Sequence, residues 1–164
     1  MISATQIKPD IFVGSYPQNE ADVDRLVSGP DITAILNLQT NDDLHALGIR
    51  WSDFLQAYKA RNILCMRYPI VDFSPNDLEN RLEGAVDMLD QLLGNGYRVY
   101  VHCTAGVCRA PAVVIGHLAW NQGMGPKAAI KLVKRLRPCS PYIDSIYLVH
   151  LSKTYNFDRT KRHR

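Results

Sequence analysis

Residues 97–111 read YRVYVHCTAGVCRAP, and this stretch decides the fold. The run YRVYVH is rich in β-branched and aromatic side chains, so it predicts a buried strand that ends at His102. A short loop containing one glycine, Gly106, follows, and Ala110-Pro111 predicts the first turn of a helix. A buried strand, a tight loop and a helix in this order are typical of α/β proteins.

The rest of the chain repeats this alternation of strands and helices. Further strands are expected at residues 11–15, 33–39 and 63–70, and further helices at 75–93, 126–136 and 141–155. The runs at 33–39 and 97–102 are nearly continuously apolar, as in parallel strands covered on both faces. We therefore expect an α/β domain over residues 1–155, with a central, mostly parallel twisted sheet flanked by helices, and a basic C-terminal tail at 156–164.

Length and composition limit the class of protein. The chain has 164 residues, of which 46% are hydrophobic and 21% charged, as in one globular domain. No apolar run is long enough for a membrane span, and the four cysteines include no C-x-x-C pair, so a soluble protein of a reducing compartment is expected. The net charge of +3 permits an anionic substrate and does not indicate a nucleic-acid partner. Nothing in the sequence indicates the oligomeric state.

The loop after His102 has the features of an anion site. A loop that curls into a helix N-terminus directs several backbone N–H groups into one concavity, and the helix dipole adds positive potential there. Such a field favours the nucleophilic thiolate form of Cys103. Arg109 supplies a planar fork for two phosphate oxygens. The candidate phosphate-binding residues are Thr104, Ala105, Gly106, Val107, Cys108 and Arg109.

Two other interpretations of this loop are open. Cys103 can be an inert cysteine at a strand end, with Arg109 capping the helix. His102, Cys103 and Cys108 can be zinc ligands, but no second ligand pair follows at a fitting spacing. We therefore expect neither a metal nor a cofactor.

The run H-C-x-x-G-x-x-R between a strand and a helix resembles the signature of cysteine-dependent phosphatases, and the chain length resembles their small dual-specificity type. The resemblance implies that the thiolate of Cys103 attacks a phosphate monoester to form a phosphocysteine, while His102 orients the loop. The leaving oxygen needs a proton. Asp72, in the loop after the strand at 63–70, is the expected acid. Asp77 is the alternative, at a position where it caps the following helix.

Several segments narrow the resemblance. Residues 9–15 (PDIFVGS), 17–18, 35–39 (ILNLQ), 72–73, 103–106 (CTAG) and 109–111 (RAP) are similar to the plant-type, laforin-like glucan phosphatases. This similarity implies a phosphorylated polysaccharide such as starch as the substrate, and the cytoplasm or a plastid as the compartment. A phosphoprotein or phosphoinositide phosphatase with the same chemistry is the alternative. A module that binds phosphate without turnover is a third possibility.

Glucan phosphatases line their channel with aromatic side chains, because sugar rings stack on them. The resemblance implies that four residues contact the substrate: Phe73, Tyr16, Trp51 and Tyr68. Trp120 is expected in the core instead. The chain departs from the family pattern by having no aromatic side chain at Ala46-Leu47 or Ala4-Thr5, and by having Val107-Cys108 where a glycine usually precedes the arginine.

The position of Cys108 suggests a redox hypothesis. A low-pKa thiolate is prone to oxidation to sulfenic acid, and a nearby cysteine traps that species as a disulfide. Cys108 is the nearest candidate in sequence for such a partner of Cys103, and Cys65 and Cys139 are the others. The plain alternative is that a small side chain simply fits at position 108.

Overall fold

A five-stranded sheet in the order β1-β2-β5-β3-β4 forms the centre of the computed structural model, which describes residues 2–162 and places side chains up to Tyr155. Four strands run parallel to one another: β2 (Ile11–Gly14), β5 (Val99–His102), β3 (Ala34–Asn37) and β4 (Leu64–Arg67). The predicted mostly parallel α/β sheet is therefore confirmed.

The strand β1 (Ala4–Lys8) was not predicted. It pairs antiparallel with β2 at the edge of the sheet, which makes the sheet mixed. Ile7 is its one fully buried residue, so the segment lacks the apolar run that marks the four central strands. An edge strand with one buried side chain has almost no pattern for sequence analysis to detect.

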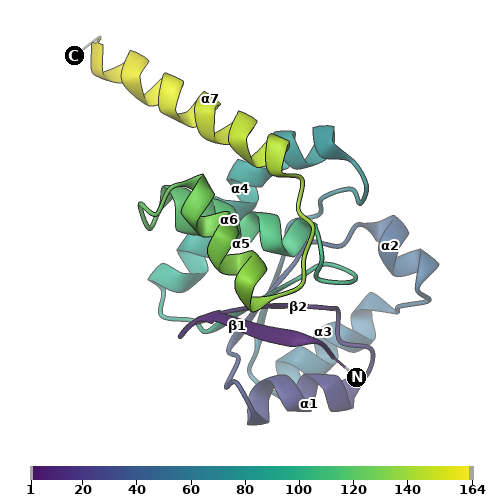
Figure 1. The fold of residues 1–164 in the computed structure, drawn as a ribbon. Coiled ribbons are helices and arrows are strands. Elements are labelled where there is room, and N and C mark those ends of the chain that lie inside the picture. The colour runs from purple at the N-terminus through teal and green to yellow at the C-terminus, as the bar shows by residue number, and fades with distance from the viewer. Residues whose placement is uncertain (1, 163–164) are drawn as a thin grey trace.

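Seven helices in the described residues cover the sheet (Figure 1). One face carries α4 (Pro75–Gly94), α5 (Arg109–Trp120), α6 (Pro126–Leu136) and the start of α7 (Ile143–Arg162). The opposite face carries α1 (Glu20–Ser28) and α3 (Trp51–Ala60). The short helix α2 (Asn41–Ala46) follows the carboxyl end of β3.

Successive side chains of the central strands point to opposite faces of the sheet and pack into two separate hydrophobic cores. Leu36 and Val101 pack with α4 and α5, whereas Ile35 and Tyr100 pack with α1 and α3. Strands covered on both faces become continuously apolar, which is why residues 33–39 and 97–102 were recognisable. Trp120 packs against the α4–α5 core, as expected.

The last helix is longer than predicted. It runs from Ile143 to Arg162, not from 141 to about 155, so most of the basic segment expected as a tail continues α7. The remaining residues, 163 and 164, lie outside the described part of the chain. In Figure 1 this helix leaves the body of the molecule beyond α4.

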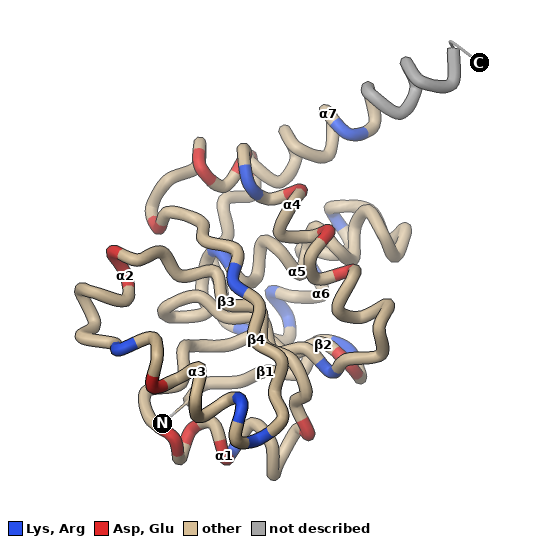
Figure 2. The backbone as a smooth tube through the Cα atoms, turned by 180° about the vertical axis from the view of Figure 1, so that it is seen from behind, with Lys and Arg blue, Asp and Glu red and all other residues tan. Residues whose placement is uncertain are grey.

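Two properties of the described part of the chain bear on its partners. None of the helices in the described residues combines the length and the apolar character that a membrane crossing requires. Lys and Arg are interspersed with Asp and Glu along the chain in Figure 2. The expectation of no nucleic-acid partner stays a prediction.

Candidate active site

The loop of residues 103–108 joins β5 to α5, and its carbonyl groups all point outward. Each of the six accepts a hydrogen bond from a group outside the segment. His102 Nδ1 donates to the carbonyl of Cys103 (3.1 Å), and the Tyr16 amide donates to that of Thr104 (3.1 Å). Arg137 donates to the carbonyls of Ala105 (3.2 Å) and Gly106 (2.6 Å). The amides of Ser140 and Ala112 donate to the carbonyls of Val107 (2.8 Å) and Cys108 (3.0 Å). Across a trans peptide the next N–H points the opposite way, so the N–H groups of residues 104–109 point inward. The loop is therefore an anion cradle.

Gly106 allows the loop to close. Its φ of 67° lies in the left-handed region that favours glycine. A Cβ at this position would lie 2.4 Å from the backbone of Gly14 and 2.6 Å from the Arg137 guanidinium. Both the backbone conformation and the close approach of β2 therefore require glycine here.

Arg109 opens α5 and is 2% exposed. Its Nη1 donates to Asp43 Oδ2 at 2.7 Å and to the carbonyl of Ile70 at 2.9 Å. Its Nη2 donates to Asp72 Oδ2 at 2.8 Å and to Thr104 Oγ1 at 3.3 Å, while Nε is buried without a partner among the described residues. One edge of the guanidinium is thus fixed by protein, and Nη2 and Nε are the groups available to a phosphate.

Asp43 is a contact of Arg109 that the sequence did not indicate. Its carboxylate also accepts a hydrogen bond from the Thr40 amide at 2.8 Å, so Thr40 and Asp43 form a capping box at the start of α2. Burial opposes ionisation of Asp43, but the Arg109 guanidinium and the bonds from Thr40 hold its pKa below the usual value. The Thr40-x-x-Asp43 spacing was the only signal, and it indicates a helix start, not a contact with Arg109.

The two candidate acids make different contacts. Asp72 lies in the loop between β4 and α4, half-buried, and its Oδ2 is bonded to Arg109. Asp77 accepts from the Val71 amide at 2.7 Å and lies 3.3 Å from Arg81. The structure brings Asp72 to the cradle and uses Asp77 at the start of α4.

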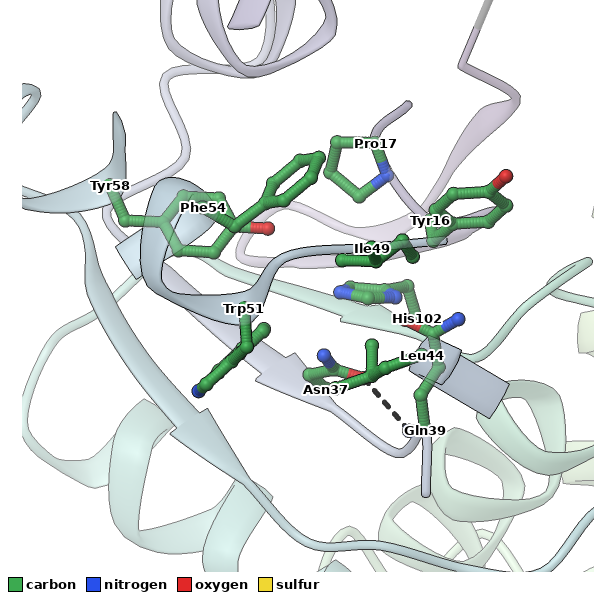
Figure 3. A pocket seen from close by; sticks show the side chains of 10 residues that line it. All are labelled: Tyr16, Pro17, Asn37, Gln39, Leu44, Ile49, Trp51, Phe54, Tyr58 and His102. Atoms are coloured by element: carbon green, nitrogen blue, oxygen red, sulfur yellow. Dashed lines mark hydrogen bonds between the residues drawn. The ribbon is translucent and has the colours of Figure 1, made fainter. Parts of the chain in front are cut away.

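His102 lies behind the cradle and is buried. Burial lowers its pKa to about 4, so the ring is neutral at physiological pH and its Nδ1–H donates to the Cys103 carbonyl. Its Nε2 and the Asn37 Nδ2 have no partner among the described residues, and both residues line a pocket of about 10 Å³ (Figure 3). That is room for about one water molecule, so this pocket is too small for a sugar ring.

Gln39 was also missed as a contributor to the site. Its amide Nε2 donates to Thr104 Oγ1 at 3.1 Å, and its backbone N–H donates to Asn37 Oδ1 at 2.8 Å. The end of β3 is therefore tied to the first turn of the cradle. An apolar strand that ends in a polar residue does not indicate this contact, because Thr104 is 65 residues away in the sequence.

The four aromatic side chains predicted to contact substrate are placed differently. Phe73 adjoins Asp72 and is 85% exposed, and Tyr16, bonded through its amide to Thr104, points its hydroxyl away from the small pocket (Figure 3). Trp51 is half-buried against Tyr58. Tyr68 packs against the core beside Gly84, where a Cβ would lie 2.1 Å from the Tyr68 hydroxyl. Phe73 thus adjoins Asp72 and Tyr16 is bonded to the loop, while Trp51 lines the same small pocket as Tyr16 and His102 (Figure 3).

The positions where the chain lacks the family's aromatic residues have other surroundings. Ala46 and Leu47 are exposed at the end of α2. Thr5 accepts a hydrogen bond from Arg137 through its hydroxyl at 3.1 Å.

All four cysteines are free thiols. Burial raises the pKa of Cys65 to about 12, and it raises the pKa of Cys108 and of Cys139 as well. Cys103 belongs to the core on the α4–α5 face, whereas Cys65 packs against the core on the α1–α3 face. Among the described residues no group of three His, Cys, Asp or Glu side chains is arranged to hold a metal ion.

Three curated proteins show how this chain relates to known sequences. It is 39% identical over 142 residues to phosphoglucan phosphatase DSP4, amyloplastic, of Castanea sativa, covering 85% of this chain and 38% of that protein. It is 37% identical to phosphoglucan phosphatase LSF1, chloroplastic, of Arabidopsis thaliana, in a match that covers 84% of this chain and 23% of that protein. It is 30% identical to laforin of Mus musculus, covering 93% and 49%. The chain therefore spans less than half the length of these relatives.

Solved structures share the fold. PTPMT1 superposes with a TM-score of 0.75 at 20% identity, and the match covers 96% of this chain and 99% of that one. Human DUSP28 superposes with a TM-score of 0.70 at 18% identity, and the match covers 92% of this chain and 95% of that one. A family model described as the dual specificity phosphatase catalytic domain matches residues 11–149. With its strand-loop-helix cradle, Cys103 and Arg109 all inside that match, the chain belongs to the dual-specificity phosphatase family.

Proposed function

We propose that this domain is a cysteine-dependent phosphatase whose substrate is a phosphorylated glucan. The observation that carries the chemistry is the hydrogen bond of 2.8 Å between Arg109 and Asp72, beside the inward N–H groups of the loop that begins at Cys103. Because Asp72 is bonded to Arg109, a nucleophile (Cys103), an anion cradle and a proton donor (Asp72) lie at one place.

The reaction follows from these groups. The Cys103 thiolate attacks phosphorus, the bond to the leaving oxygen breaks, and that oxygen takes a proton from Asp72. Water then attacks the phosphocysteine, Asp72 accepts a proton from it, and orthophosphate and the thiolate are released. In the free enzyme Asp72 is bonded to Arg109, so the incoming phosphate takes its place on Nη2.

Two observations support a glucan as the substrate. The names of the two plant relatives, at 39% and 37% identity, describe phosphoglucan phosphatases. Phe73, beside Asp72, offers an exposed aromatic face on which a sugar ring can stack. The same names include the amyloplast and the chloroplast, which favours a plastid over the cytoplasm as the compartment.

The test compares phosphate release from solubilised amylopectin, a phosphotyrosine peptide and a phosphoinositide at equal phosphate concentration. We expect amylopectin to have the highest kcat/KM and Cys103→Ser to abolish release from all three. A higher kcat/KM on the peptide or the lipid would overturn the glucan assignment. Absence of turnover on para-nitrophenyl phosphate would indicate a phosphate-binding module.

A further inference from the structure

Arg137 is a buried cation that the chemistry above does not use. It caps the C-terminus of α6 and is 4% exposed. Its φ of −134° and ψ of 129° are extended, because the following Pro138 disfavours helical backbone at this position. The side chain therefore leaves the helix, and its hydrogen bonds take it to the cradle.

The guanidinium joins the middle of the loop to β1. Nε donates to the carbonyl of Gly106 at 2.6 Å and Nη2 to the carbonyl of Ala105 at 3.2 Å. Nη1 donates to Thr5 Oγ1 at 3.1 Å and to Ser3 Oγ at 3.3 Å. Two consecutive carbonyls are held outward by one side chain, so the N–H groups of Gly106 and Val107 are held inward.

Among the residues whose side chains are described, the charge of Arg137 has no acidic partner. Its acceptors are carbonyl and hydroxyl oxygens, and it forms no ion pair with a carboxylate among the residues whose side chains are described. A buried cation without an opposite charge is costly. A phosphate dianion in the cradle supplies that opposite charge through a low-dielectric medium, where the attraction is strong.

We propose that Arg137 is a positioning residue for phosphate binding. It orients two of the six inward N–H groups, and its positive charge acts on the bound dianion without touching it. This inference adds a residue from α6 to Cys103, Arg109 and Asp72. It rests on the proposed role of the loop as the phosphate site.

The experiment compares Arg137→Met, which removes both the fork and the charge, with Arg137→Lys, which keeps the charge alone. The control is Arg135→Met, an exposed arginine near the end of the same helix with the same change in net charge. Calorimetric titration with inorganic orthophosphate gives the affinity of the cradle. Alkylation of Cys103 by iodoacetate relative to iodoacetamide, followed by mass spectrometry, reports the local potential, because only iodoacetate is an anion.

We expect Arg137→Met to weaken orthophosphate binding at least about tenfold, the effect of losing one hydrogen bond to a charged group. It should also lower the iodoacetate-to-iodoacetamide ratio. Arg137→Lys should restore the ratio but not the affinity, because an ammonium cannot hold both carbonyls in a planar fork. Arg135→Met should match the wild type in both measurements.

A merely structural role makes a different prediction. Arg137→Met would then lower Tm while orthophosphate affinity and the alkylation ratio, measured well below Tm, stayed within twofold of wild type, and this result would overturn the inference. If Arg137→Met does not fold, Arg137→Lys provides the test. Wild-type orthophosphate affinity in Arg137→Lys would show that the planar guanidinium is not needed to orient the loop, and this would overturn the inference.

Failure of this inference can be told apart from failure of the proposed function. Neither readout requires turnover. If orthophosphate binding depends on Arg137 but the wild type hydrolyses no ester, the inference about Arg137 stands and the proposed enzymatic function fails. If the wild type hydrolyses amylopectin and Arg137→Met binds orthophosphate normally, the proposed function stands and the inference about Arg137 fails.

Discussion

Asp72 and Asp77 lie five positions apart in the sequence, yet only Asp72 contacts Arg109. Asp72→Asn should lower kcat by about 10²–10⁴ on alkyl phosphates, the range for a lost general acid. Aryl phosphates should lose much less, because their leaving groups need no proton. Paired kcat values for a sugar phosphate and para-nitrophenyl phosphate measure the difference.

Asp77→Asn is the matched control for that measurement. It removes the negative charge beside Arg81 and leaves one oxygen where the carboxylate had two for the Val71 amide and Arg81, so it should destabilise the start of α4 without changing the dependence on the leaving group. Equal losses on both substrates in Asp72→Asn, or leaving-group dependence in Asp77→Asn, would assign the proton donor to Asp77.

His102 couples stability to pH. Burial depresses its pKa from 6.5 to about 4, so between these values the unfolded chain binds a proton that the folded protein does not. Stability therefore falls as pH drops from about 6.5 to about 4, by at most about 1.4 kcal/mol per pH unit. Urea unfolding at pH 7.0 and 5.0 should show a smaller difference in His102→Asn than in the wild type.

The control for His102 is His45→Gln, which changes an exposed histidine on α2. It should keep the wild-type pH dependence. An unchanged slope in His102→Asn would mean that His102 titrates alike in the folded and unfolded states.

The loop between β4 and α4 carries both the proposed acid and the best-placed aromatic residue. Phe73 has a φ of 55°, which costs an L-residue about 1–2 kcal/mol, and its amide is bonded to Asp72 Oδ1 at 3.1 Å. The loop thus holds Phe73 exposed beside the carboxylate. Because α2 ends in Ala46 and Leu47, with no aromatic ring, stacking on a polymer must rely on other elements.

We expect Phe73→Ala to lower phosphate release from amylopectin at least about tenfold more than turnover of para-nitrophenyl phosphate, because only the polymer uses the exposed ring. Phe73→Gly should show the same selectivity and be up to about 1 kcal/mol more stable than Phe73→Ala, since glycine tolerates this φ. Uniform loss on both substrates would favour a phosphoprotein or phosphoinositide substrate.

The sheet separates the cysteines at the scale of the whole molecule. Cys65 and Cys103 pack into cores on opposite faces, so a disulfide between them would require the strands to be rearranged. Cys139 packs against the same core as Cys103, and Cys108 caps α5, but the raised pKa of each leaves little thiolate to attack a sulfenic acid at neutral pH.

Mild peroxide followed by dithiothreitol tests this arrangement. Cys65→Ser should recover activity to the same extent as the wild type. If Cys108 traps the oxidised Cys103, Cys108→Gly should recover poorly, and recovery of the wild type should increase with the pH of oxidation. Poor recovery of Cys65→Ser would contradict the placement of these two cysteines on opposite faces.

Residues 97–111 were sufficient to predict the strand, the cradle, Cys103 and Arg109, because a backbone turn and the residues that it aligns are local in sequence. The order of strands also predicted the loop of Asp72. Asp43, Gln39 and Arg137 were not predictable, since the bonds they make to Arg109, Thr104 and Gly106 span 66, 65 and 31 residues. Those contacts exist only after the fold has placed α2, the end of β3 and the end of α6 around the loop. The sequence by itself therefore determined the strand, the loop and the helix start with the residues that they carry, and tertiary structure decided which side chains hold the loop in shape.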